Sequence, residues 1–153
     1  MDKAAEEFIE QMGVYAQSDG LSRIAGRMFG FFIMAGGPHS FSEVAEKLQV
    51  SRASVSTNAR ILESFGAIER TSRPGDRQDY FRLAADPYAR MLEGSMMRIQ
   101  RIERLATRTL GDLPATEREG RGRLREMLTF YGIARQSTQD VLAKWGSRKP
   151  KGK

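Results

Sequence analysis

Segment 51–60 concentrates arginines and short hydrogen-bonding side chains. Ser51 is a residue type that caps helix N-termini, and it predicts a helix over 52–65. Val55, Ala59 and Leu62 share one face of that helix, so we expect them to pack on the protein. The polar side chains that we expect to be available for binding are Ser51, Arg52, Ser54, Ser56, Thr57, Asn58 and Arg60. Hydroxyl, amide and guanidinium groups are the ones that pair with phosphates and base edges, so this face predicts contact with double-stranded DNA.

A hairpin rich in arginine is expected directly after this helix. Short strands are predicted over 67–72 and 77–83, and the proline and glycine of 73–76 favour a turn between them. The hairpin arginines are Arg70, Arg73, Arg77 and Arg82. We expect Arg73 and Arg77 to reach a neighbouring minor groove, because narrow A·T segments concentrate negative potential there.

Two carboxylates, Asp76 and Asp79, lie among these arginines. Phosphates would repel them, so we expect them to orient Arg77 or its neighbours through local ion pairs. Two alternatives stay open at this point. The helix could be an ordinary amphipathic one with solvated serines, and the hairpin could be a charged loop without a ligand.

The order of elements around this face is that of a winged helix-turn-helix. A short helix over 42–48, a tight turn at 49–50, the helix 52–65 and the hairpin follow one another. In that architecture the second helix enters the major groove. Apolar residues at helical spacing predict further helices over 3–17, 21–35, 87–110 and 115–145. We therefore predict a mainly α fold with a small β-wing.

Two glycines interrupt the predicted helix 21–35. Gly26 and Gly30 each cost about 1 kcal/mol relative to alanine inside a helix. Their spacing of four places them on one face. We expect the compensation to be the close approach of another backbone.

The sequence around the predicted DNA-binding unit resembles the MarR superfamily of regulators. The resemblance is carried by residues 41–56 (FSEVAEKLQVSRASVS) and 62–70 (LESFGAIER). Residues 20–27 (GLSRIAGR) and 73–81 (RPGDRQDYF) are similar to the narrower GbsR-like branch. The resemblance implies a homodimer in which each unit reads half of an inverted-repeat operator. Such a dimer would repress by occupying promoter DNA. Some relatives in the family sense small molecules, and an effector of this chain is not identified by its residues.

Four segments are expected on this basis. They are an N-terminal dimerisation helix at 1–19, a winged helix-turn-helix at 20–86, a C-terminal helical dimerisation region at 87–145 and a basic tail at 146–153. A long apolar stripe supports the third segment, and it consists of Met91, Leu92, Met96, Ile99, Ile102, Leu105, Ala106 and Leu110. One small domain would not cover a stripe of this length, although an intramolecular helical bundle is the alternative.

Composition excludes several classes of function. The chain has no cysteine and one histidine, His39, so thiolate metal sites and disulfides are absent and no nucleophile–base–orienter set is available. There is no phosphate-loop or dinucleotide-binding motif. We expect no enzyme activity, cofactor or metal. The acidic N-terminus lacks the pattern of a signal peptide, and no apolar run is long enough to span a membrane, so we expect a cytoplasmic protein.

Two rival functions are left open by the sequence. A winged helix can serve as a protein-interaction adaptor, in which case large apolar side chains would cover the outward face of 52–60. The chain could instead be a non-specific architectural DNA binder. In that case the tail would dominate, because residues 144–153 contribute +5 of the total net charge of +6.

Overall fold

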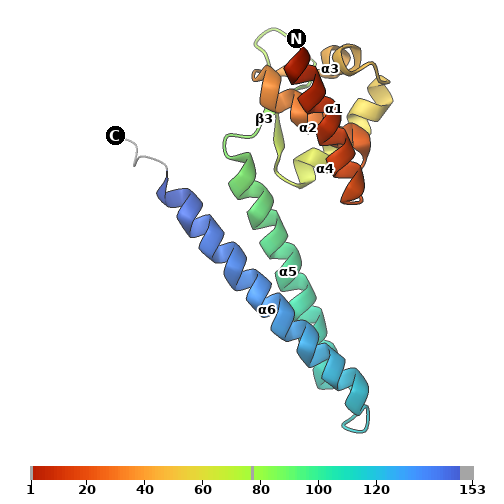
Figure 1. The fold of residues 1–153 in the computed structure, drawn as a ribbon, viewed down its shortest axis with the longest axis vertical. Helices are drawn as coiled ribbons and strands as arrows, with labels where there is room; N and C mark the ends of the chain where they lie inside the picture. The colour runs from red at the N-terminus through yellow and green to blue at the C-terminus, as the bar shows by residue number, and fades with distance from the viewer. Residues whose placement is uncertain (1, 77, 149–153) are drawn as a thin grey trace. The chain divides into compact units, whose positions relative to one another are not determined.

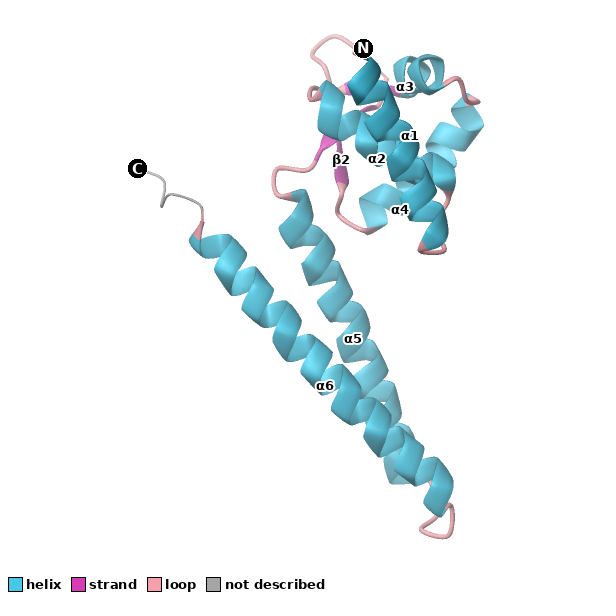
Figure 2. Ribbon diagram, in the orientation of Figure 1, coloured by secondary structure: helices cyan, strands magenta, loops and turns pink. Residues whose placement is uncertain are grey.

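The computed structural model describes residues 2–76 and 78–148 and is mainly helical (Figure 1). Its elements are α1 (Lys3–Ser18), α2 (Arg23–Ala35), β1 (His39–Ser40), α3 (Phe41–Leu48), α4 (Arg52–Ser64), β2 (Ile68–Thr71), β3 (Tyr80–Leu83), α5 (Pro87–Asp112) and α6 (Arg118–Ser147). The chain divides into two compact units, Met1–Met91 and Leu92–Lys153. All three strands lie in the first unit (Figure 2). The prediction of a mainly α fold with a small β-wing is confirmed.

The core of the first unit is formed by the inward faces of its helices and of the sheet. The largest fully buried side chains are Met28, Phe31, Phe32, Val44, Leu48, Val55, Ile68 and Phe81. They come from α2, α3, α4, β2 and β3 and form one continuous apolar cluster. Burial of such side chains is the main favourable term in folding, so this cluster fixes α4 against α2 and the sheet.

Helices α1 and α2 cross at their glycines, which confirms the expected close approach. A Cβ atom added to Gly26 would overlap the Met12 carbonyl oxygen and lie 2.5 Å from the Ala16 Cβ. A Cβ added to Gly30 would lie 3.2 Å from the Ile9 Cα. The approaching backbone is therefore that of α1, and its contact compensates for the low helix propensity of the two glycines.

The small sheet contains a strand that the sequence did not predict. Its order is β1-β3-β2, and both pairings are antiparallel. His39 of β1 faces Phe81, and Arg70 of β2 faces the same residue from the other side. Strand β1 has two residues, too few for an alternating pattern to show in the sequence. It ties the loop after α2 to the wing.

Two helix starts also differ from the expected ones. Helix α3 begins at Phe41, one residue before the expected start, and is capped by Ser40: the Ser40 Oγ accepts from the Glu43 N–H at 3.3 Å, and the Glu43 Oε2 accepts from the Ser40 N–H at 2.6 Å. This reciprocal pair is a capping box, which satisfies two backbone donors at once. Helix α2 begins at Arg23, two residues after the expected start, and is capped by Ser22.

The second unit consists of α6 and of α5 from Leu92 onward, which run antiparallel. Near the connecting loop, the Arg121 Nη1 donates to the carbonyl oxygens of Leu110 and Leu113 at 2.7 Å and 2.6 Å. Further along, the Arg135 Nε donates to the Glu103 Oε2 at 3.2 Å. The first contact satisfies orphan carbonyls at the end of α5, as a C-terminal cap does.

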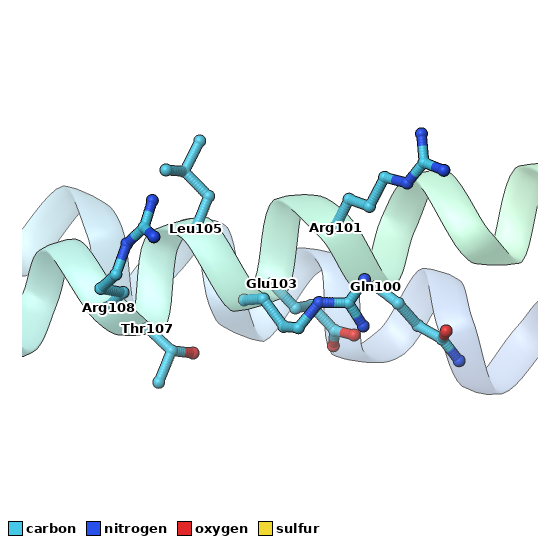
Figure 3. A pocket seen from close by; sticks show the side chains of 7 residues that line it. Gln100, Arg101, Glu103, Leu105, Thr107 and Arg108 are labelled. Atoms are coloured by element: carbon cyan, nitrogen blue, oxygen red, sulfur yellow. The ribbon is translucent and has the colours of Figure 1, made fainter.

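Much apolar surface of the second unit stays uncovered within one chain. Helix α6 has no buried residue, and its exposed apolar side chains are Met127, Phe130, Ile133 and Val141. On α5, Leu105 of the expected stripe is 55% exposed within one chain, whereas its neighbour Ala106 is 3% exposed. Leu105 and Glu103 are among the residues that line an open pocket on α5, and Figure 3 shows their side chains pointing away from one another. Among the described residues, no helix is long and apolar enough to cross a membrane.

The α1–α2 crossing gives a stability prediction. Gly26→Ala should lower the free energy of unfolding by about 3 kcal/mol or more, because its Cβ meets backbone and cannot be accommodated by a side-chain rotation. Gly122→Ala is the matched control: Gly122 lies in α6 with nothing within 4 Å of an added Cβ, and alanine there should be neutral or stabilising by up to about 1 kcal/mol. Urea unfolding followed by circular dichroism measures both changes. Equal effects at the two positions would contradict the close packing of α1 on α2.

Candidate DNA-binding site

Helix α4 is held by one apolar face and by a capped N-terminus. Val55, Ala59 and Leu62 are buried, as the spacing predicted. At the start of the helix, the Ser51 Oγ accepts from the Ser54 N–H at 3.1 Å and lies 2.8 Å from the Ser54 Oγ. The remaining free N–H groups of the first turn point out of the helix end, where they favour an anion.

The opposite side of α4 is open. Arg52, Ala53, Thr57 and Arg60 are exposed, and Ser54 and Ser56 are half-buried. Within residues 2–76 and 78–148, neither Arg52 nor Arg60 forms an ion pair. Both guanidinium groups are therefore free to pair with an anion from outside the chain. The face carries no large apolar side chain, unlike the surface expected of a protein-binding adaptor.

Asn58 does not lie on this open face, which corrects the expectation that it flanks the exposed side. Its side chain is 5% exposed, and its Nδ2 donates to the Ser54 carbonyl oxygen at 2.7 Å. Position 58 follows Val55 by three residues and precedes Leu62 by four, so it lies on the packing side of the helix. The residue type suggested a solvent-facing position, whereas the spacing indicated the buried one.

Two of the wing arginines are neutralised within the protein. Arg70 lies 3.1 Å from the Asp79 carboxylate and 3.7 Å from that of Glu63. Arg82 lies 2.8 Å from the Glu69 carboxylate. Asp79 thus orients an arginine, as predicted for the wing carboxylates, but the arginine is Arg70. These pairs leave little net charge at the base of the wing for binding.

Arg73 is exposed but held in place. Its Nη2 donates to the Pro38 carbonyl oxygen at 2.7 Å, and its guanidinium carbon lies 4.2 Å from the centre of the Tyr80 ring. The Tyr80 hydroxyl donates to the Asp76 Oδ2 at 2.6 Å, and this hydrogen bond raises the pKa of Tyr80. Pro38 and Tyr80 therefore hold Arg73 in place, and the sequence predicted neither contact. Any residue type offers a backbone carbonyl, so the acceptor at Pro38 could not be recognised from the sequence.

Arg77, the other arginine expected at the wing tip, lies outside the described residues. The described part of the site thus comprises the open face of α4 and the anchored Arg73. No group of three or more Asp, Glu or His side chains in the described ranges could hold a metal ion. The arrangement of a capped second helix, an open polar face and a β-hairpin defines a winged helix-turn-helix DNA-binding protein.

Comparisons with known proteins identify the family. A model of the MarR family matches residues 19–79. The HTH-type transcriptional regulator MmpR5 of Mycobacterium tuberculosis is 37% identical over 146 residues, which cover 93% of this chain and 87% of the relative. A crystal structure described as that of a transcriptional regulator has 36% identity and a TM-score of 0.84, with 95% of this chain and 99% of that chain covered. The chain belongs to the MarR family: it is a DNA-binding transcriptional regulator and not an enzyme.

The single histidine, His39, is half-buried beside the Arg73 anchor. The His39 ring packs edge-on against Phe31, with 5.0 Å between ring centres, and its buried Nε2 has no hydrogen-bond partner among the described residues. Burial lowers the pKa of His39, Glu43 opposes this shift, and Arg73 adds to it. The neutral form is therefore the one that the folded protein accommodates.

This environment predicts pH-dependent stability. The unfolded chain binds a proton near the ordinary histidine value of 6.5, whereas the folded chain resists protonation. Stability should be fully present above that value and decrease as the pH falls from 7 to 5. His39→Gln, which does not titrate, should show a flatter profile of the urea midpoint over this range. Parallel profiles for the wild type and the variant would remove His39 as the cause.

Proposed function

We propose that the protein acts as a homodimeric repressor that binds an inverted-repeat operator. The open face of α4 lies in the major groove, and the wing reaches the adjacent minor groove. The observation that carries this proposal is that Arg52 and Arg60 form no ion pair with the described residues and lie on an otherwise small and polar helix face. Narrower membership of the GbsR-like branch stays a prediction from residues 20–27 and 73–81.

The uncovered apolar surfaces support the homodimer. None of the 30 residues of helix α6 is buried within one chain. Its large apolar side chains Phe130 and Ile133 are 63% and 65% exposed. On α1, Phe8 and Tyr15 are exposed as well. Apolar surface left open to water marks interaction sites. A two-fold interface would bury these side chains on both copies.

Two-fold symmetry would then set the geometry of the operator. A dimer of helix-turn-helix units reads two half-sites whose centres lie roughly 34–36 Å apart, one turn of DNA. Occupation of a promoter by such a dimer blocks transcription. An effector would act by shifting the helices of the interface and so changing the distance between the two α4 helices.

Base reading by α4 is tested with Arg60→Ala. We expect the preference for an operator over random duplex to fall by roughly 1–3 kcal/mol, because a bidentate arginine–guanine pair contributes about that much discrimination. The operator is obtained by selecting bound fragments from genomic DNA, and affinities are measured by fluorescence anisotropy at fixed salt. Arg125→Ala, which removes the same charge from an exposed position on α6, is the control and should leave the preference unchanged. Equal losses on operator and random DNA would assign Arg60 to phosphate contact instead.

The dimer surface is tested with Phe130→Asp. A charge at this exposed apolar position should cost nothing in a monomer but convert the dimer to monomer in sedimentation velocity. Ala143→Asp introduces the same charge at another exposed position of α6, away from Phe130, and should leave the dimer intact. A Phe130→Asp protein that sediments as the wild type does, with unchanged helix content, is the outcome that refutes this interface.

A further inference from the structure

Glu69 of β2 binds two arginines from different elements. Its Oε1 accepts from the Arg82 Nε of β3 at 2.9 Å, and its Oε2 accepts from the Arg90 Nη1 of α5 at 2.9 Å. The Glu69 side chain is 22% exposed, so water screens these pairs less than it screens a fully exposed pair. One carboxylate thus joins the wing to the start of α5.

The aliphatic part of the Arg90 side chain is also held in place, by the turn after α4. A Cβ atom added to Gly66 would lie 2.7 Å from the Arg90 Cβ, so the turn after α4 approaches the Arg90 stem closely. Gly66 has a φ of +72°, a conformation that glycine adopts without strain. The position of Arg90 is therefore set jointly by the turn after α4 and by Glu69.

The neighbouring residue Arg70 makes the corresponding connection on the other face of β2, because successive side chains of a strand point to opposite faces. It pairs with Glu63 of α4 and with Asp79 of the wing. Strand β2 is consequently linked by ion pairs to α4, to the wing and to α5. Among these links, only that of Glu69 includes α5.

We propose that Glu69 is a positioning residue for DNA binding. By holding Arg82 and Arg90 on one carboxylate, it fixes the orientation of the wing relative to the first turn of α5. Any change in the direction of that turn then alters how the wing presents Arg73 to DNA. The inference rests on the proposed contact between the wing and the minor groove.

Charge alone gives the opposite expectation, which makes the inference testable. Glu69→Gln removes a negative charge and releases two arginines, so a purely electrostatic effect would strengthen binding to DNA. A positioning role predicts weaker binding in spite of the added positive charge. The sign of the change in affinity therefore distinguishes the two.

The experiment measures operator affinity for the full-length chain carrying Glu69→Gln. We expect a loss of about tenfold at fixed salt, in the range found for residues that act through a shared network. Glu93→Gln is the matched control, since Glu93 is an exposed carboxylate of α5 outside this network, and it should bind as the wild type does or slightly more tightly. If Glu69→Gln fails to fold, Arg90→Met keeps the stem against Gly66 and removes the link to Glu69. Arg125→Ala removes the same charge from an exposed position of α6, so a positioning role predicts a clearly larger loss for Arg90→Met than for Arg125→Ala, whereas equal losses would overturn it.

A double-mutant cycle with Arg73→Ala distinguishes the positioning role of Glu69 from the proposed contact between the wing and DNA. If Glu69 acts through the wing, Glu69→Gln should have no further effect once Arg73→Ala has removed the wing contact. Unchanged or tighter binding of Glu69→Gln, with a clear loss for Arg73→Ala, would overturn the positioning role alone. No loss for Arg73→Ala would overturn the wing contact of the proposed function.

Discussion

The burial of one face of α4 is the interaction on which the site depends. Val55, Ala59 and Leu62 enter the core shared with α2 and the sheet, and this fixes the rotation of the helix about its own axis. Because a helix has fixed angular spacing, that rotation also decides which side chains face outward. The open side with Arg52, Thr57 and Arg60 is thus a consequence of packing and needs no separate support.

The shape of the wing, unlike the position of α4, is set by polar contacts. All three of its described arginines make internal contacts: Arg70 and Arg82 pair with carboxylates, and Arg73 is held by a carbonyl and an aromatic ring. The hairpin is too short for a core of its own, so these contacts define its shape. The net charge of the wing is therefore a weaker guide to DNA binding than the fixed position of Arg73.

The sequence predicted the helices well and the individual contacts less well. Apolar spacing identifies each helix because a stripe of several turns repeats the same signal, and the fold class follows from their order. Strand β1 was not predicted because a strand of two residues shows no alternation of side chains. The strand it pairs with, β3, also lies far along the chain. Asn58 was misplaced because residue type was given more weight than its angular position between Val55 and Leu62. The link between Arg73 and Pro38 spans 35 positions and involves a backbone oxygen, which leaves no pattern to read.

The crossing of α1 and α2 has a consequence for how the chain can vary in evolution. A Cβ on Gly26 would lie 2.9 Å from the Gly13 Cα, and a Cβ on Gly13 would lie 2.7 Å from the Arg27 side chain. Each glycine is thus constrained by the helix that carries the other, and neither can drift to a larger residue unless the helices move apart. Exposed polar positions of α1 such as Glu7 and Gln11 have no such restriction within the chain. Homologues that keep this crossing are expected to preserve both glycines together while these polar positions of α1 diverge.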